Sequence, residues 1–433
     1  MAHRLMISSV KGAKFVYDEL HGFIPLKGIE LELVDTPTFQ RLRRVKQLAQ
    51  AWYVYPGAVH TRFSHSLGVF RITSVLTSKF VKDGLLSEED ADLVKVAALL
   101  HDIGHTPYSH ALEQYLLVKY GLRHEDITTW IIEEDPYIKD VLIKYGIEPS
   151  EISAIIRGIH KNQTLNMILS SDLDVDRLDY LPRDALHTGV AYGLIDLDRI
   201  LQTITLDKSG YLSVPIKSIH AIESFYIARL HMYRAVYYHK TITSYQLLLS
   251  TIYRLMINDP NIRTYLEPYV DPKGIMNSVK EGRFHLWDDF FVGGLINLVM
   301  NKDLGSKELK DLISMYLRRR SYKVIYERIV FSYEPIRSGL KELVAKVNEV
   351  LEREGLSDYS VTTFLEVINI TSEKDSVRII DVSGESKPIR LFESSIVRNL
   401  PKYMNIFRVY ALPPVEAKAR SVLSKVLSHE VSI

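Results

Sequence analysis

The fold is decided by residues 100–105, which read Leu100-His101-Asp102-Ile103-Gly104-His105. They close the apolar run 91–100, which predicts a helix that stops near Gly104, since glycine commonly ends helices. An imidazole next to a carboxylate can hold one metal ion, and the partial negative charge of a helix C-terminus favours a cation there. Because His-Asp dipeptides are common, the weight of this pair depends on the segments around it.

Two other segments carry side chains that divalent metals bind. The upstream segment reads Arg62-Phe63-Ser64-His65-Ser66-Leu67-Gly68. The downstream segment 172–180 contains the aspartates Asp172, Asp174, Asp176 and Asp179. Together with His101-Asp102 they can supply two imidazoles and two carboxylates, a ligand mixture suited to a metal that does hydrolysis. The spacing alone does not choose among the aspartates.

A structural interpretation competes with the metal site for each residue taken singly. A lone histidine on an apolar helix is usually a hydrogen-bonded core residue, and a lone aspartate is usually a helix cap. The joint pattern favours the site, because further histidines follow closely at His105, His110 and His124. These histidines can relay protons or orient the ligands.

The composition is that of an ordinary globular chain. Its 433 residues suffice for one large domain and a smaller one, and 46% of them are hydrophobic. The formal net charge of +1 indicates no broad attraction to nucleic acid or to a membrane surface. The absence of cysteine excludes disulfides, cysteine nucleophiles and thiolate metal sites. Since neither a signal peptide nor a membrane-spanning run is found, we expect a cytoplasmic protein.

Helical patterns dominate most of the chain. Two short β-like stretches, 13–17 and 29–33, come first, and Thr36-Pro37 is typical of a cap followed by proline at the first helical position. Helices are then predicted over residues 63–81, 91–100, from 106 onward, 150–160, 172–186 and 217–256.

The pattern changes near Ile329. Strands are predicted over residues 361–370, 377–382 and 407–412, and helices over residues 336–353 and 414–427. We therefore predict a mainly α protein, with a helical catalytic domain at residues 1–328 and a smaller α+β domain at residues 329–433.

Two predicted helices each present one polar face. On the first, an arc of about 100° carries Asp176, Arg177, Tyr180 and Asp184. On the second, an arc of roughly 80° carries Arg229, Tyr233, Tyr237 and Lys240. Cations with phenols suit a polyphosphate beside a sugar, whereas a solvated face with aromatic packing is the structural alternative. Pro182 can bend the first helix and blur its arc.

Several longer stretches resemble one known family. They read Asp35-Thr36-Pro37-Thr38-Phe39-Gln40-Arg41-Leu42-Arg43, Lys46-Gln47-Leu48 and Tyr55-Pro56-Gly57-Ala58, and continue through residues 62–69, 101–110 and 174–180. Fainter similarity covers residues 237–240 and 407–410. The chain resembles the HD-superfamily deoxynucleoside triphosphate triphosphohydrolases (dNTPases), above all members that join a SAM domain to the HD domain. The SAM domain has no counterpart in this sequence.

The resemblance implies an HD-domain helical fold and one divalent metal ion. Its implied ligands are His65, His101, Asp102 and Asp176, and the ion could be Mg, Mn, Fe, Ni or Zn. His110 resembles the catalytic histidine near the α-phosphate, with His124 and Glu113 as its relay partners. His105 matches a residue that contacts the phosphates.

The resemblance also implies how a substrate would bind. The triphosphate would be gripped by Arg62, Arg177, Tyr180 and Arg229, although Arg177 replaces a lysine of the family. The sugar 3′-hydroxyl would contact Gln47 and Asp184, and the base would lie near Leu48. Tyr237 would pack against the 2′ carbon and exclude a ribose hydroxyl. The implied reaction converts a dNTP and water into a deoxynucleoside and inorganic triphosphate.

An activator site is implied as well. The residues that match a guanine-nucleotide site are Lys14, Asp35, Gln40 and Arg43. For a second activator site Lys240 and Arg408 match, but the segment 203–206 lacks the basic residue expected there. Activation by GTP followed by a dNTP would then assemble a homo-oligomer, a dimer or a tetramer, in which the C-terminal domain serves oligomerisation or allostery.

Two other functions compete. One is an HD phosphodiesterase or nucleotidase that acts on another nucleotide. The other is a non-catalytic nucleotide sensor or nucleic-acid binder, which the basic runs 41–46 and 318–320 would support. The small net charge argues against nucleic acid, and a complete metal and histidine set is hard to explain in a pure sensor.

Overall fold

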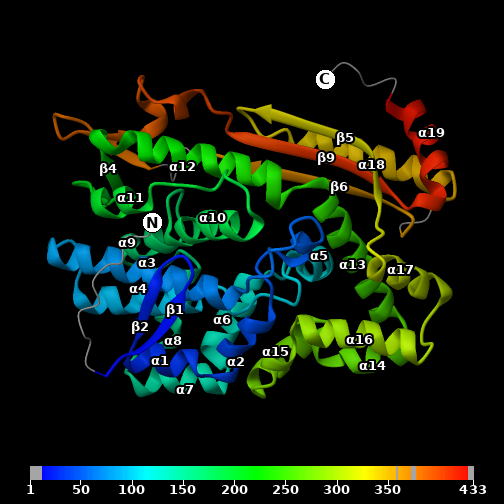
Figure 1. The fold of residues 1–433 in the computed structure, drawn as a ribbon, viewed down its shortest axis with the longest axis horizontal. Helices are drawn as coiled ribbons and strands as arrows, with labels where there is room; N and C mark the ends of the chain where they lie inside the picture. Colours follow the sequence, from blue (N-terminus) through cyan, green and yellow to red (C-terminus); the bar gives the residue numbers. More distant parts are fainter. Residues whose placement is uncertain (1–11, 357–358, 372–376, 428–433) are drawn as a thin grey trace.

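Helices fill most of the molecule, and a long sheet lies along one side of it (Figure 1). The computed structural model describes residues 12–356, 359–371 and 377–427, and the side chains of His110 and of residues 337–338 and 426–427 lie outside this description. The predicted mainly α class is confirmed. Among the described residues no helix combines the length and the apolar character needed to cross a bilayer.

The elements before the sheet are mostly helices. The N-terminal part contains β1 Lys14–Asp18, β2 Gly22–Leu26, α1 Gly28–Val34, α2 Pro37–Gln40, α3 Arg62–Lys82, α4 Glu88–Leu100, α5 His110–Tyr120, α6 His124–Glu134, α7 Pro136–Lys144, α8 Pro149–Ile156, α9 Gln163–Leu169 and α10 Val175–Thr188. The middle part contains α11 Leu197–Thr203, β3 Thr205–Leu206, β4 Leu212–Pro215, α12 Ile219–Met232, α13 Lys240–Asn258, α14 Pro260–Leu266, α15 Pro272–Lys280, α16 Asp289–Asn301 and α17 Lys307–Leu317.

Helix α4 positions the His-Asp pair. Ser87 caps its N-terminus by accepting the N–H of Asp90 at 3.0 Å, and the acidic first turn complements the helix dipole. Its last five residues, 96–100, are buried, and the helix packs against α3. Because α4 ends at Leu100, His101 and Asp102 follow at its C-terminus, where His101 lies beside His65 of α3.

The prediction of a strand over residues 29–33 is wrong, since this segment belongs to helix α1. Ile29, Leu31, Leu33 and Val34 satisfy both an alternating pattern and a helical one, so a segment this short cannot be assigned by its period. Packing of α1 against α7 decides in favour of the helix.

The predicted helix over residues 217–256 is also wrong, because it is broken. Helix α12 passes into a π-helical turn, Tyr233–Tyr237, and α13 starts afresh at Lys240, with His239 as its cap. The wider π turn rotates later residues away from the α-helical period. Lys240 therefore does not continue the face that begins at Arg229.

The C-terminal part builds the sheet. It contains β5 Lys323–Ser332, α18 Arg337–Arg353, β6 Val361–Asn369, β7 Arg378–Ile380, β8 Ser386–Pro388, β9 Tyr403–Ala411 and α19 Glu416–Leu427. Strand β9 lies between β5 and β6 and pairs antiparallel with both. The predicted strands and helices of this part are confirmed, whereas β5 and β8 were not predicted.

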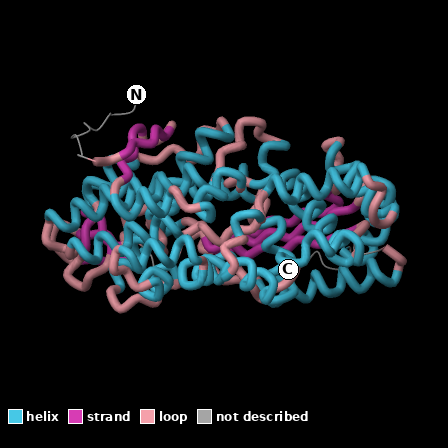
Figure 2. The backbone as a smooth tube through the Cα atoms, turned by 90° about the horizontal axis from the view of Figure 1, so that it is seen from below, coloured by secondary structure: helices cyan, strands magenta, loops and turns pink. Residues whose placement is uncertain are grey.

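Both faces of this sheet are covered, and Figure 2 shows its strands running between helices. On one face the strands pack against α18 and α19, as at the buried Val347 and Ala419. On the other face Met404 and Ile406 pack with Leu230 and Tyr233. The sheet thus lies directly on the break between α12 and α13.

A second, smaller sheet joins the two parts of the chain. Its order is β3-β4-β7-β8, and β4 pairs with β7 in parallel through Val214 and Ile379. The predicted boundary between residues 328 and 329 falls within β5. The division into two domains stays a prediction.

Candidate metal centre

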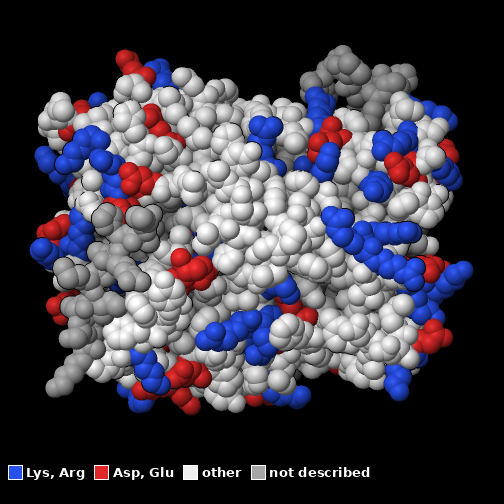
Figure 3. Space-filling model, viewed as in Figure 1, with Lys and Arg blue, Asp and Glu red and all other residues white. Residues whose placement is uncertain are grey.

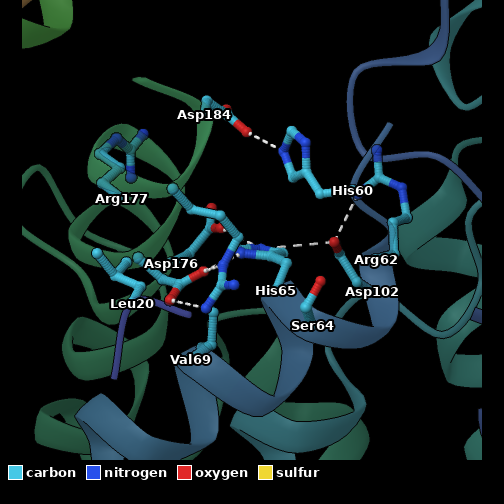
Figure 4. A network of polar contacts seen from close by, with 12 residues as sticks. Leu20, His60, Arg62, Ser64, His65, Val69, Asp102, Asp176, Arg177 and Asp184 are labelled. Atoms are coloured by element: carbon cyan, nitrogen blue, oxygen red, sulfur yellow. Dashed lines mark hydrogen bonds and ion pairs between the residues drawn. The ribbon is translucent and has the colours of Figure 1, made fainter. Parts of the chain in front are cut away.

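The structure brings the four predicted ligands to one place from three helices. Asp176 Oδ1 lies 3.0 Å from His65 Nε2 (Figure 4). The same oxygen lies 3.7 Å from His101 Nε2. Asp102 Oδ2 lies 3.6 Å from His65 Nε2, and Asp102 Oδ1 lies 3.4 Å from His101 Nε2. Ligand atoms about 2.1 Å from one ion lie about 3 to 4 Å apart, so each of these histidine–carboxylate distances fits a shared ion. One atom each of His65, His101 and Asp102 lies within 4.8 Å of the others, and Asp176 faces both histidines.

The other aspartates of the downstream segment have different partners. Asp172 binds Arg229 and Tyr226. Asp174 caps α10 by accepting the N–H of Arg177, and it also pairs with the side chain of that arginine. Asp179 contacts Nδ1 of His65 and not Nε2, the ring nitrogen that faces Asp176. Among the four aspartates, Asp176 is the one placed opposite both histidines.

In both histidines the nitrogen Nε2 is placed to bind a divalent cation. His65 Nδ1 lies 2.8 Å from Asp179 Oδ2, and His101 Nδ1 lies 2.8 Å from the carbonyl oxygen of Ala98. In the neutral ring each Nδ1 therefore carries the proton, so loss of the second proton leaves a lone pair on Nε2 for a cation. His101 Nε2 is buried and makes no hydrogen bond to the described residues. A buried lone pair without a donor, beside two carboxylates, suits a bound cation.

Metal binding is expected to strengthen as the pH rises. Burial alone would lower the pKa of His65, but its hydrogen bonds to Asp176 and Asp179 raise it to about 10. The metal-free protein thus holds a proton that a cation must displace. We expect the apparent Kd for Mn²⁺ to fall at least about tenfold per pH unit between about pH 6 and about pH 8. Competition with a chelator of known pKa measures it, and a constant Kd would contradict the ligand role of His65.

Two more histidines lie beside the ligands. The rings of His105 and His124 stack with centroids 3.7 Å apart, and His105 Nε2 lies 3.2 Å from Asp102 Oδ1. His124 Nδ1 donates to Glu113 Oε1 at 2.7 Å. The side chain of His110, the first residue of α5, lies outside the described part of the structure.

The pKa values of the two stacked histidines are shifted in opposite directions. Burial and the positive charge of Arg62 hold the pKa of His105 well below its usual value. Burial also acts to lower the pKa of His124, but the hydrogen bond to Glu113 outweighs it and raises that pKa. Burial and Arg62 thus favour the neutral form of His105, whereas Glu113 favours the protonated form of His124, and opposite shifts of this kind suit a division of acid and base roles.

The site opens into a cavity of about 550 Å³. Of the predicted residues, those that line it are Gln47, Leu48, Arg62, His65, Asp102, His105, Glu113, His124, Asp176, Tyr180, Asp184 and Tyr237. Sequence reasoning missed Phe364 and Glu366 of β6, which close one wall. No local pattern could have found them, because β6 reaches the cavity only through the fold of the C-terminal sheet.

A second group of polar side chains in the cavity wall is joined by hydrogen bonds. Asp184 accepts from Tyr237 Oη at 2.8 Å and lies 2.7 Å from His60 Nε2. The rings of Tyr180 and Tyr237 meet edge to face, with centroids 5.7 Å apart. Gln47 Oε1 is buried and accepts no hydrogen bond from the described residues. These groups could bind a hydroxyl-bearing ligand.

The predicted phosphate-binding arginines have protein partners. Arg62 donates to Asp102 Oδ2 at 2.5 Å and to Ser109 Oγ at 2.9 Å. Arg177 binds Asp174, and Arg229 donates to Asp172 at 2.8 Å. Arg62 lines the cavity, whereas Arg177 and Arg229 are not among its lining residues. Their contact with a phosphate stays a prediction.

Of the predicted activator residues, Lys14 lies in β1, and the others lie just before α2, at its end or just after it. Lys14, Asp35 and Arg43 are exposed. Arg43 donates to Gln40 Oε1 at 2.8 Å, and its guanidinium lies 3.5 Å from the centre of the Phe63 ring. At the second predicted activator site Arg408 is buried and bonded to Glu327. Both activator sites stay predictions.

Comparison with known proteins agrees with this arrangement. Residues 62–184 match the family described as HD domain, and residues 195–281 match the HD associated region. The uncharacterized protein MJ1154 of Methanocaldococcus jannaschii is 34% identical over 410 residues, which cover 93% of this chain and 80% of that protein. The first of these matches spans the three segments that carry the metal ligands.

Two other comparisons name an activity. The deoxynucleoside triphosphate triphosphohydrolase SAMHD1 homolog of Dictyostelium discoideum is 30% identical over 370 residues, which cover 80% of this chain and 67% of that protein. A crystal structure of a phosphohydrolase from Bacteroides thetaiotaomicron superposes with a TM-score of 0.72 at 28% identity, covering 92% of this chain and 99% of that one. The similarity therefore extends over nearly the whole fold.

Proposed function

Because the chain belongs to the HD-domain phosphohydrolase family, we propose that it is a metal-dependent dNTP triphosphohydrolase. One observation carries the proposal: a single cavity is lined by the candidate ligands His65, Asp102 and Asp176, by the stacked histidines, and by Asp184 and Tyr237. Its volume of about 550 Å³ is suited to a nucleotide-sized ligand. The phosphates would lie at the metal end and the deoxyribose against Tyr237.

The residues divide the chemistry among them. His65, His101, Asp102 and Asp176 would hold a divalent ion, which when bound supplies polarisation of a phosphoryl oxygen and activation of water. Water attacks the α-phosphorus, the bond to the 5′-oxygen breaks, and that oxygen takes up a proton. We assign this proton to His110, supported by the charged pair of His124 and Glu113. His105 would lie beside the phosphates.

Product analysis tests the proposal. The metal-loaded protein is incubated with each dNTP in oxygen-18 water, with and without GTP, and the products are separated by ion exchange. We expect deoxynucleoside and inorganic triphosphate in equal amounts, with the label in the triphosphate. Monophosphate with pyrophosphate, or hydrolysis of ribonucleotides alone, would contradict it.

Replacing Tyr237 is expected to relax the choice of sugar. Tyr237→Ala removes the ring that would exclude a 2′-hydroxyl, so the ratio of kcat/KM for GTP to that for dGTP should rise about tenfold or more. Tyr237→Phe keeps the ring and loses only the hydrogen bond to Asp184, so it is the matched control. An unchanged ratio in Tyr237→Ala would show that the ring does not select the sugar.

The competing functions lack a comparable observation. An HD phosphodiesterase or nucleotidase would use the same metal centre, and the product analysis distinguishes it. A nucleic-acid binder would need a broad basic surface, whereas Figure 3 shows Lys and Arg in small groups among uncharged and acidic residues on the face drawn.

The proposal also includes activation by a guanine nucleotide, coupled to assembly of a homotetramer. The supporting observation is that Lys14, Asp35 and Arg43 are exposed, where a nucleotide could reach them. Light scattering of the protein with and without GTP tests this part, and an assembly state that ignores GTP would contradict it.

A further inference from the structure

A short turn of the N-terminal hairpin reaches the back of the metal centre. Strands β1 and β2 pair with Asp18 opposite Gly22, and Glu19, Leu20 and His21 connect them. Asp18 Oδ1 accepts the N–H groups of Leu20 at 3.0 Å and of His21 at 2.9 Å. Gly22 has a φ of +70°, which glycine adopts without strain in a three-residue hairpin loop. The turn therefore has a defined shape, and it carries His21 inward.

The side chain of His21 ends on a buried carboxylate. It is only 8% exposed, and its Nε2 lies 2.6 Å from Asp179 Oδ1. Asp179 is fully buried, and its other oxygen accepts from His65 Nδ1 at 2.8 Å. A line of two hydrogen bonds thus connects the hairpin to a metal ligand. In the view of Figure 4, Leu20 of the turn lies on the side of His65 away from Asp102.

Asp179 is held in one orientation by its donors. Arg183 donates to Asp179 Oδ2 at 2.8 Å and to Oδ1 at 3.0 Å, and it also binds Asp18 of the hairpin at 2.9 Å. Each carboxylate oxygen therefore accepts two hydrogen bonds. Loss of His21 would leave Oδ1 with Arg183 as its one donor and weaken the hold on the orientation in which Asp179 faces His65.

We infer that His21 is a positioning residue for the metal ligand His65, acting through Asp179. The inference rests on the proposed metal site. Groups that orient a ligating histidine commonly change metal affinity by about 10- to 100-fold, although they never touch the metal. A merely structural role, in which His21 only fastens the hairpin to α10, would lower thermal stability and leave the affinity of the folded protein unchanged.

Mn²⁺ affinity of the full chain separates the two roles. For His21→Ala we expect a Kd about tenfold higher than that of the unsubstituted protein. His21→Gln should recover it to within about threefold, because the glutamine amide can reach the position of the histidine Nε2. His21→Asn, whose amide is too short, should behave as His21→Ala does and serves if the alanine variant does not fold. Unfolding curves of the metal-free variants establish that each is folded at the titration temperature.

The control comes from the same turn. Glu19 contacts Arg183 and His187 but not Asp179, so Glu19→Gln should change the Kd by less than about threefold. An unchanged Kd in both His21→Ala and His21→Asn, or an equal loss in Glu19→Gln, would overturn the inference. If the unsubstituted protein does not bind Mn²⁺, or if His65→Ala binds it equally well, the metal site itself is refuted and the inference falls with it.

Discussion

Asp176→Ala is expected to abolish metal binding and to lower phosphohydrolase activity by about 10³-fold or more. Asp176 Oδ1 faces the Nε2 atoms of both His65 and His101, so its loss removes the carboxylate that joins the two imidazoles. Its side chain is one-third exposed, which makes loss of the fold a poor explanation for the defect. Metal content after dialysis and turnover of dNTPs measure the two effects.

The chain offers a matched control at the start of α11. Asp176 follows the aspartate cap of α10 by two residues, and Asp198 follows the aspartate cap of α11 in the same way. Both variants lose the same favourable charge at a helix N-terminus, worth about 0.3–1 kcal/mol. Asp198→Ala should therefore keep its metal and its turnover. Retention of metal by Asp176→Ala would contradict the ligand assignment.

Gly68→Ala is expected to lower the free energy of unfolding by about 3 kcal/mol and to weaken metal binding about tenfold or more. Gly68 lies in α3, one turn from His65. A methyl group there would overlap Oδ1 of Asp179 and Nη2 of Arg183, with the Asp179 Cγ only 2.7 Å away. Both groups are fully buried, so neither can move without disturbing their ion pair. Chemical denaturation and Mn²⁺ titration measure the two changes.

Gly294→Ala, at a second helical glycine, is the control and is expected to raise the free energy of unfolding slightly. Its added methyl group would meet no described atom within 4 Å, and the residue is exposed in α16. Alanine is the better helix former by about 1 kcal/mol, so this variant should be slightly more stable. If Gly68→Ala were equally stable, the close approach of Asp179 to α3 would not constrain the fold.

Much of the candidate metal centre could be proposed from the sequence, because its chemistry restricts the residue types. Without cysteine, a hydrolytic metal needs histidines and carboxylates, and the motifs around His65, His101 and Asp176 are long enough to identify the family. The C-terminal end of α4 was also predicted, since apolar periods and glycine stops are local, whereas its start at Glu88 lies three residues before the predicted one. The hydrophobic period gave the wrong element in α1, where it fits both a strand and a helix. It also failed to show the break in the helix at Tyr233–Tyr237, where the backbone forms a π turn.

The sequence by itself therefore determined the helical class, the family and the set of candidate ligands, because each depends on residue types and short-range spacing. Only the tertiary structure decided which groups support them. In the folded chain Arg229 binds Asp172, and Glu366 of β6 lines the cavity. His21 contacts Asp179, a residue 158 positions away. Such contacts depend on how distant elements pack, and no periodicity along the chain records them.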